Sequence, residues 1–509
     1  MTGFVAPIDD ILFALRHVAD AARVEDWDDA LASDILGHFG QFAEGVLAPL
    51  NSVGDTQGAR LVDGRVIMPD GFGDAYAQLA EGGWQGLRAP ENFGGMEVSA
   101  LVAAGVSEVF SGANHSLQMV CGLVPGAIET LLHFGTQAQQ DEWIPRLASG
   151  EVLSTMCLTE AGAGSDLSAI RCKAVRDGAD WRLEGEKIFI SGGDQDMSKG
   201  ILHLVLARSG TAEDGLKGLS LFLCRGDDGV QVTRIEEKLG LHASPTCQLA
   251  FQGTHAELVG TEGDGLRAMF TVMNHARLDV ALQGVAHAAR AAQIARGYAQ
   301  ERVQGRRKDG APAKLSDHVD VQRMLAEQDA LAVGARAMCH VAFVELECGT
   351  RPDLVAFLTP LCKVFGSEAG IKAADLGIQI LGGYGYLNEY QMGQIWRDAR
   401  ITSIYEGANG IHERSIATRG LKGPGADQFA ELIRELGGGS DKLMGALADW
   451  EAWRDRLRTS DAAEYEAHDF AQATARLFFR ACLAKCAAVA DRHPEPARIK
   501  ALAERVLSS

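Results

Sequence analysis

Cys157-Leu-Thr-Glu-Ala-Gly-Ala-Gly-Ser-Asp166 lies where the hydrophobic pattern of the chain changes. Before this segment, apolar residues recur three and four apart, which predicts helices, and after it they alternate, which predicts strands. Gly162 and Gly164 permit close approach of the backbone to a ligand, and the hydroxyls of Thr159 and Ser165 could hold a polar ring or a phosphate. Taken alone, the segment is more simply interpreted as a connecting turn.

Residues 1–155, upstream of this switch, are expected to form an all-α N-terminal domain. Ser33-Asp34 is expected to begin a helix whose apolar residues continue to Val46. Asp70 precedes a second run of apolar residues at helical spacing.

Residues 156–262, downstream of the switch, are expected to form a middle β-domain. The runs at 172–176 and 181–184 are joined by Asp177-Gly178-Ala-Asp180, which is a strong hairpin signal. Further short strands with glycine-rich turns predict a small antiparallel barrel or sandwich.

Helical periodicity returns after the β-rich region. Residues 263–421 are expected to form a four-helix bundle, because three long apolar helical patterns are followed by a fourth that starts near Asn409. Residues 422–509 are expected to form a linker, rich in glycine up to about residue 440, and then a C-terminal helical extension. The fold class is therefore α+β and multidomain.

Composition excludes several classes of protein. The chain has 509 residues, 47% hydrophobic and 23% charged, which is enough for more than one core and argues against disorder. A net charge of -20 argues against nucleic-acid binding or attraction to an anionic membrane. No apolar run approaches the ~18–20 residues of a membrane helix, and residues 1–20 lack a basic region ahead of an apolar core. With ten cysteines and no CxxC pair, we expect reduced thiols in a cytoplasmic protein without a membrane span.

Familiar catalytic and metal motifs are absent from the sequence. It contains no GxSxG elbow, no HExxH and no phosphate-binding loop of the GxxxxGK[ST] type. The histidines show no ligand spacing, so we expect no metal site. Pairs such as His412-Glu413 are interpreted as a solvated helix face.

Three further segments suggest chemistry. Lys187-Ile-Phe-Ile-Ser-Gly-Gly193 presents an aromatic residue, a hydroxyl and a glycine turn. Glu301-Arg-Val-Gln-Gly-Arg306 and the later Gln379-Ile-Leu-Gly-Gly383 combine arginine with glycine, which suits a pyrophosphate. Glu406 lies in the apolar stretch Ile404-Tyr-Glu-Gly-Ala-Asn-Gly-Ile411, where desolvation would raise its pKa and make it a usable base. In isolation, a strand end, a charged helix end and a surface carboxylate are the favoured explanations of these segments.

Taken together, the segments resemble the acyl-CoA dehydrogenase family. CLTEAGAGSD, KIFISGG, RLDVALQG with ERVQGR, QILGGYGY and WRDARITSIYEGANGI occur in the order and at the spacings of that family, between about residues 80 and 420. The resemblance implies an N-terminal helical domain, a middle β-domain and a C-terminal four-helix bundle. It also implies FAD as the cofactor, between the β-domain and the bundle.

The resemblance implies roles for individual residues. Glu406 matches the family's catalytic glutamate, which takes the α-proton of an acyl-CoA thioester while the β-hydrogen leaves as hydride to flavin N5, giving a trans-2-enoyl-CoA. Arg277, Ser165 and Gly407 match positions at the substrate. The matched cofactor-binding positions are Cys157, Thr159, Gly164, Ser165, Phe189, Ser191, Arg302, Gln379, Gly382 and Gly383.

Substrate and partners also follow from the resemblance. It implies an oxidoreductase of fatty acid β-oxidation that acts on CH–CH groups, with a fatty acyl-CoA or a 3-methylthiopropionyl-CoA-like thioester as substrate. An electron-transfer flavoprotein is the implied electron acceptor. The long N- and C-terminal segments resemble a longer bacterial subgroup in which the extension can occupy the dimer–dimer surface, which favours a homodimer over a tetramer.

Two alternatives from other classes stay open at this point. One is a flavin oxidase or monooxygenase on the same fold, in which O2 replaces the protein acceptor. The other is a non-catalytic flavin-binding member of the family, against which Glu406 argues. Anaerobic reduction followed by reoxidation in air would separate the dehydrogenase from the oxidase, and a non-catalytic member would show no flavin bleaching with any acyl-CoA.

Overall fold

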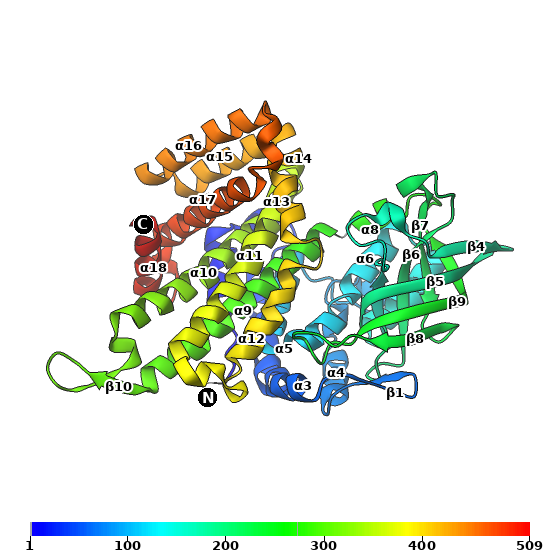
Figure 1. The fold of residues 1–509 in the computed structure, drawn as a ribbon, viewed down its shortest axis with the longest axis horizontal. Coiled ribbons are helices and arrows are strands. Elements are labelled where there is room, and N and C mark those ends of the chain that lie inside the picture. The colour runs from blue at the N-terminus through cyan, green and yellow to red at the C-terminus, as the bar shows by residue number, and fades with distance from the viewer. Residues whose placement is uncertain (1–2, 272, 509) are drawn as a thin grey trace. The chain divides into compact units, whose positions relative to one another are not determined.

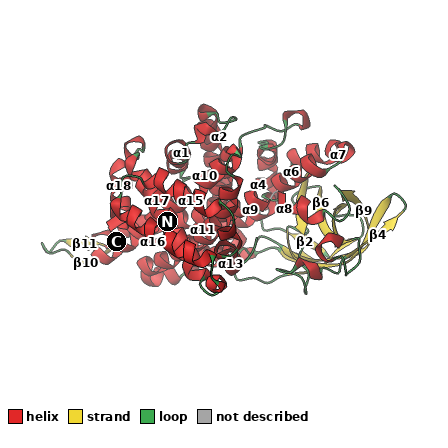
Figure 2. Ribbon diagram, turned by 90° about the horizontal axis from the view of Figure 1, so that it is seen from above, coloured by secondary structure: helices red, strands yellow, loops and turns green. Residues whose placement is uncertain are grey.

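The computed structural model describes residues 3–271 and 273–508, without the side chains of residues 270, 271 and 273. The chain forms two compact units. We call Met1–Ala48, Ala100–Ala113 and His275–Ser509 the helical unit, and Pro49–Ser99 with Asn114–Asn274 the β-unit. The ribbons are shown in Figures 1 and 2.

The helical unit is built around three long helices. Its elements are α1 (Ile8–Phe13), α2 (Asp29–Phe42), the first part of α5 (Ala100–Cys121), α9 (Met273–Glu301), β10 (Val303–Arg306), β11 (Pro312–Lys314), α10 (Val319–Cys348), α11 (Pro352–Leu381), α12 (Met392–Arg400), α13 (Asn409–Ala417), α14 (Arg419–Lys422), α15 (Gly425–Gly437), α16 (Asp441–Arg458), α17 (Ala467–Ala488) and α18 (Pro496–Ser508). Helices α9, α10 and α11 share one buried core cluster, and α12 and α13 both pack on α11. The loop between α12 and α13 is therefore supported by α11.

Small residues allow the central helices to pack closely. A Cβ placed on Gly284 of α9 would lie 2.1 Å from the carbonyl oxygen of Gly366 on α11, so both positions need glycine. Alanines dominate the core nearby, with Ala288 and Ala373 fully buried. Among the described residues, one helix, Pro352–Tyr386, is long and apolar enough to cross a membrane, and 78% of its apolar window is buried within the protein. Burial in the bundle accounts for that apolar character.

The β-unit contains a closed barrel and its flanking helices. Its elements are α3 (Asn51–Gln57), β1 (Arg60–Val62), β2 (Arg65–Ile67), α4 (Phe72–Glu81), the rest of α5, α6 (Val124–Phe134), α7 (Gln137–Ala148), β3 (Val152–Cys157), β4 (Lys173–Asp177), β5 (Asp180–Ser191), β6 (Gly200–Arg208), β7 (Leu219–Arg225), β8 (Val230–Ile235), β9 (Thr246–Val259) and α8 (Gly265–Thr271). Strands pair in the order β6-β4-β5-β9-β7, and β7 pairs back with β6, so the sheet closes on itself. The hairpin expected around Asp177-Gly178 is confirmed as β4–β5.

Several local expectations were wrong. The segment expected to be a linker at 422–440 contains α15, because Phe429 and Leu432 are buried and Gly425 packs against the backbone of α11. Helix α2 begins at Asp29, since the side chain of Asp28 accepts the capping bond from Leu31 N at 2.9 Å. The hairpin β1–β2 interrupts the region expected to be all-α, and the barrel includes a parallel pair, β3–β6.

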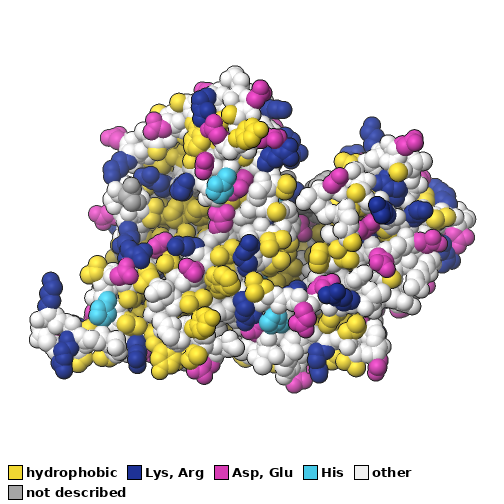
Figure 3. Space-filling view, in the orientation of Figure 1, with side chains coloured by type: hydrophobic (Ala, Val, Ile, Leu, Met, Phe, Trp, Pro, Cys, Tyr) yellow, Lys and Arg dark blue, Asp and Glu magenta, His cyan; other side chains and the backbone are white. Residues whose placement is uncertain are grey.

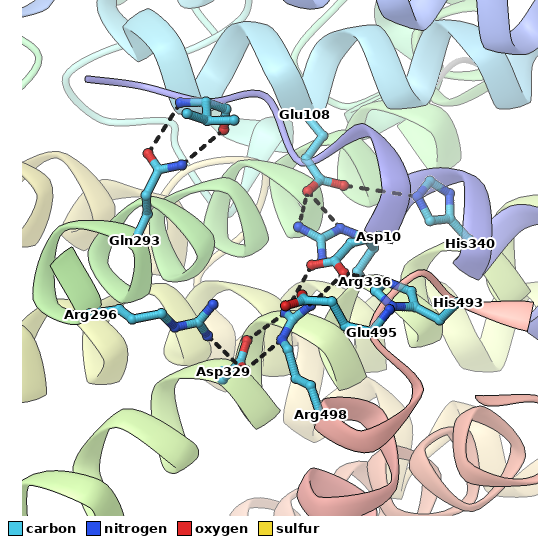
Figure 4. Close-up of polar contacts among 11 residues, drawn as sticks. Asp10, Glu108, Gln293, Arg296, Asp329, Arg336, His340, His493, Glu495 and Arg498 are labelled. Atoms are coloured by element: carbon cyan, nitrogen blue, oxygen red, sulfur yellow. Dashed lines mark hydrogen bonds and ion pairs between the residues drawn. The ribbon is translucent and has the colours of Figure 1, made fainter. Parts of the chain in front are cut away.

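A buried ion-pair cluster fastens both ends of the chain to the bundle (Figure 4). Arg336 of α10, 1% exposed, donates to Glu108 Oε1 from Nε at 2.8 Å and from Nη2 at 2.6 Å. Its Nη1 lies 3.4 Å from Asp10 Oδ2 on α1. Arg498 of α18 bridges Asp10, at 2.9 Å, and Asp329, at 2.7 Å. Helices α1 and α18 are thereby tied to α10 and to each other.

Candidate active site

The loop that carries Glu406, residues 405–408, is strained. Glu406 has φ 51° and Gly407 has φ 97°, so two consecutive residues adopt left-handed backbone conformations. A Cβ on Gly407 would lie 2.6 Å from His412 Nε2, which makes glycine necessary there. Such conformations persist only where the surroundings enforce them, and they cluster at functional sites.

Three side chains enforce this conformation, one for each of three consecutive residues. The hydroxyl of Tyr405 donates to Gln283 Oε1 on α9. His412 Nε2 donates to the carbonyl oxygen of Glu406 at 3.0 Å. Lys363 Nζ, fully buried on α11, donates to the carbonyl oxygen of Gly407 at 2.7 Å.

His412 and Glu413 do not form the solvated helix face expected from the sequence. His412 is 4% exposed and Glu413 is 7% exposed. Burial lowers the pKa of His412 to about 4, so its imidazole is neutral at pH 7 and one ring nitrogen can donate to the loop. The expectation was wrong because the C-terminal helix α17 packs over α13 and removes this face from solvent.

Burial raises the pKa of the Glu406 carboxyl. The positive charges of Arg277 and Lys363 oppose this shift, and the negative charge of Asp279 adds to it. The structure gives the Glu406 carboxylate no hydrogen bond and no ion pair with any residue it describes. A carboxylate that is desolvated and unpaired has the properties of a general base.

Arg277 of α9 is half-buried beside this loop, and its Nε has no hydrogen-bond partner among the described residues. Burial lowers the pKa of its guanidinium, and the charge of Glu406 acts in the opposite direction. An orphaned cationic donor of this kind can bind the polar part of a substrate.

A second group of predicted residues lines a surface pocket of about 450 Å³ in the helical unit. Arg302 lies at its wall, with the guanidinium carbon 5.7 Å from the ring centre of Tyr384. Gly382 and Gly383 line the same pocket, and a Cβ on either would meet nothing within 4 Å. Gln379 is exposed one turn earlier, near the end of α11. The pocket offers a cation and open backbone, which suits a pyrophosphate.

The remaining predicted cofactor residues belong to the β-unit, on two segments that are joined by a hydrogen bond. Ile188 N donates to the carbonyl oxygen of Thr159 at 2.9 Å. Gly164 and Ser165 are exposed on the first segment. On the second segment, Phe189 is 60% exposed, with φ 59°.

Two other predicted cofactor residues near these groups are not exposed. Ser191, on the same segment as Phe189, is half-buried. Cys157 is fully buried, and burial raises the pKa of its thiol to about 12.

Sequence reasoning missed the pair that holds these two segments together. Lys187 is fully buried, and its Nζ donates to Glu160 Oε1 at 2.8 Å and to the carbonyl oxygen of Leu158 at 2.9 Å. Glu160 Oε2 in turn accepts from Arg171 N at 2.7 Å. Glu160 and Lys187 both lie inside motifs that the sequence analysis quoted. The signal for the pair was a lysine at a strand position whose side chain should face inward.

The comparisons with known proteins cover most of the chain. Three family models match it: the acyl-CoA dehydrogenase N-terminal domain at residues 39–151, the middle domain at 155–254 and the C-terminal domain at 263–421. The chain belongs to the acyl-CoA dehydrogenase family. Enzymes of this family are FAD-dependent oxidoreductases, and FAD is the cofactor of this member.

Relatives extend over the additional segments as well. The chain is 39% identical to the 3-methylmercaptopropionyl-CoA dehydrogenase of Ruegeria pomeroyi, over 93% of this chain and 85% of the relative. It is 34% identical to a broad-specificity linear acyl-CoA dehydrogenase, FadE5, of Mycobacterium tuberculosis, over 91% and 81%. The structure of Caenorhabditis elegans ACDH-11 in complex with C11-CoA matches the fold with a TM-score of 0.82 at 21% identity, covering 100% of this chain and 92% of that one.

The residues present fit FAD. The pocket at Arg302 and Gly382 has the cation and the open backbone that a pyrophosphate needs. Phe189 is an exposed aromatic side chain suited to contact with a flavin ring. Among the described residues, no three His, Cys, Asp or Glu side chains lie together as they would around a metal ion.

Proposed function

We propose that this family member removes hydrogen from Cα and Cβ of an acyl-CoA thioester to give a trans-2-enoyl-CoA, with Glu406 as the base. The observation that carries this proposal is the unpaired Glu406 carboxylate, whose pKa burial raises, on a loop held by Tyr405, His412 and Lys363. A structural carboxylate would be paired, and a strained loop without a function would relax.

Glu406 accepts the α-proton of the thioester and ends the step protonated. Bound FAD supplies the acceptor for the β-hydrogen and its electron pair. Glu406 must lose its proton to solvent before the next turnover. Arg277 and Lys363 provide positive charge near the reacting centre, and this charge opposes loss of the basic form of Glu406. We assign the Glu406 N–H as one donor to the thioester oxygen, where negative charge develops.

The substrate we propose is a linear or thioether-containing acyl-CoA. Two relatives support it: one is a 3-methylmercaptopropionyl-CoA dehydrogenase and the other is a broad-specificity linear acyl-CoA dehydrogenase. We further propose an electron-transfer flavoprotein as electron acceptor, a homodimer as the assembly and the cytoplasm as the location. The remaining positions in this assignment are Ser165 and Gly407 at the substrate, and Cys157, Thr159, Gly164, Ser165, Phe189, Ser191, Arg302, Gln379, Gly382 and Gly383 at FAD.

Anaerobic titration of the holoenzyme with a panel of acyl-CoAs tests the proposal. The panel varies chain length, branching and a thioether at the γ-position, and bleaching of the flavin absorbance is the readout. Bleaching by at least one member, with loss of bleaching in Glu406→Gln that still binds FAD, is the expected result. Rapid reoxidation of the reduced wild type by air alone would favour the oxidase alternative. No bleaching by any member would favour a non-catalytic role.

A further inference from the structure

We propose that Gln472, on helix α17 of the C-terminal extension, positions the Glu406 loop through a chain of hydrogen bonds. The inference rests on the proposed function, because it assumes that Glu406 is the base. Residue 472 lies outside the family model for the C-terminal domain, which ends at 421. Gln472 is a positioning residue, since its side chain makes its contacts two side chains away from the loop.

The chain begins with the amide of Gln472, which bridges two carboxylates. Its Nε2 donates to Glu368 Oε2 on α11 at 2.9 Å and to Glu413 Oε1 on α13 at 3.3 Å. The two hydrogens of one NH2 group thus satisfy two acceptors of like charge. Without this donor, the two carboxylates would face each other without a bridging donor, and Glu368 would lose one of the two hydrogen bonds that hold its side chain.

Glu368 passes this constraint to the residue that begins α13. Its Oε1 accepts from Asn409 Nδ2 at 3.2 Å, and the same nitrogen lies 3.1 Å from Ser367 Oγ. Asn409 Oδ1 then accepts from Lys363 Nζ at 2.9 Å. The carboxylate and the ammonium group together allow only one orientation of the Asn409 amide.

Lys363 closes the chain on the loop itself. Its Nζ donates both to Asn409 Oδ1 and to the carbonyl oxygen of Gly407, at 2.9 and 2.7 Å. Burial lowers the pKa of Lys363 to about 8, and the negative charge of Glu406 acts in the opposite direction. The position of the Lys363 ammonium in this buried site therefore depends on its two hydrogen-bond acceptors. Loss of the Asn409 acceptor would free Lys363 to move and would release the backbone next to Glu406.

The packing of the extension supports this role. Helix α17 contacts α10, α11, α13 and α15, so it runs along the side of the bundle that carries the loop (Figure 1). Its apolar side is anchored by Phe470, Phe478 and Leu483, all fully buried. Gln472 is consequently held by a rigid helix and not by a mobile tail, which a positioning residue requires.

The test compares Gln472→Met with Arg476→Met in the holoenzyme. Methionine keeps the length and the helix propensity of glutamine but cannot donate a hydrogen bond. Arg476 lies one turn further along α17, is exposed, and forms no hydrogen bond or ion pair with any part of the chain that the structure describes. Glu368→Gln, which removes a charged acceptor without changing shape, is the second variant in case Gln472→Met folds poorly.

Two readouts separate positioning from a general structural effect. Amide hydrogen exchange of the peptide covering 405–412 is expected to accelerate about tenfold in Gln472→Met, the effect of losing one hydrogen bond to a charged group, and to match wild type in Arg476→Met. With an acyl-CoA that bleaches the wild-type flavin, kcat is expected to fall about tenfold in Gln472→Met while KM stays the same.

The proposal would be overturned if the peptide 405–412 exchanged its amide hydrogens at the same rate in Gln472→Met as in Arg476→Met. An unchanged kcat despite faster exchange would overturn it as well, because the loop would then not depend on this ordering for catalysis. If no acyl-CoA reduces the wild-type flavin, the proposed function fails, and the exchange comparison still decides whether Gln472 orders the loop.

Discussion

Asp10 and Glu406 are both half-buried carboxylates of the helical unit, yet their pKa values move in opposite directions. Burial acts to raise the pKa of each. At Asp10 the hydrogen bonds of His493 and Arg498 and the charge of Arg336 overcome burial and hold the pKa well below the ordinary range. At Glu406 two cations act only at longer range, and the pKa stays raised.

The difference shows what separates a structural carboxylate from a reactive one. Burial sets the energetic cost of the charge, and directly bonded partners decide whether that cost is offset. Asp10, near the N-terminus, is bonded by His493 and Arg498 near the C-terminus, and so ties the two ends of the chain together (Figure 4). Glu406 is left without partners while its backbone is held, which keeps the carboxylate available to a substrate.

The largest effect is expected from Glu406→Gln. Because Glu406 is the general base we propose, its replacement should slow flavin reduction about 10³-fold or more. Stopped-flow measurement of flavin bleaching gives the rate constant, and flavin absorbance of the purified variant checks that FAD is retained. A rate within tenfold of wild type would show that another group removes the proton.

Arg336→Met tests the structural carboxylates, because it removes a cation that pairs with Asp10. It leaves the carboxylates of Glu108 and Asp10 without their shared cation, which should lower the free energy of unfolding by about 3 kcal/mol or more. Denaturant unfolding of the holoenzyme measures this loss. The double variant Glu108→Leu/Arg336→Met should recover part of it, and equal stability of the single variant and wild type would contradict the account.

Asp10→Asn tests the contrast with Glu406 through the pH dependence of the free energy of unfolding. The folded-state pKa of Asp10 lies below its ordinary value of 3.8, so its contribution to stability is present above about pH 4 and is lost as the pH falls further. The variant should be about 2–3 kcal/mol less stable than wild type at pH 7, and the gap should close toward pH 2. Unfolding followed across this range checks the sign, and a constant gap would refute it.

His468→Ala should have the smallest effect. Its Nδ1 lies 2.9 Å from Glu413 Oε1, but its side chain is 68% exposed, so the pair is screened by water. We expect a change in unfolding free energy below about 0.5 kcal/mol and no change in the rate of flavin reduction. A large loss in either quantity would mean that Glu413 depends on His468 and not on Gln472.

Most of the fold could be predicted from local pattern. The sequence predicted a helical extension after about residue 440, where the structure has α16 (Asp441–Arg458), and the turn chemistry at Asp177-Gly178 predicted its hairpin. Helix α15 was missed because the glycines in this segment were interpreted as a flexible linker. In the structure, Gly425 is needed for close packing against α11. Whether a glycine marks flexibility or contact depends on what it packs against, and the sequence does not carry that information locally.

The site was predictable only in part, and for a similar reason. The motif around Glu406 pointed to a base, because an acidic residue in an apolar stretch is unusual. Lys363 and Gln472 could not be found this way, since each is a single polar residue on a helix whose partner lies far away in sequence. The acidity of the chain carried no information about the site, and Figure 3 shows acidic and basic side chains interspersed over the visible surface.

The pH dependence of flavin reduction in single turnover tests the central claim most directly. The claim is that the Glu406 carboxylate, desolvated and unpaired, is the base. The rate constant should rise with pH through an apparent pKa above 4.5, the ordinary value for glutamate, and this rise should be absent from the residual rate of Glu406→Gln. A rate constant that is flat with pH down to 4.5, or a rise that persists unchanged in Glu406→Gln, would contradict the account.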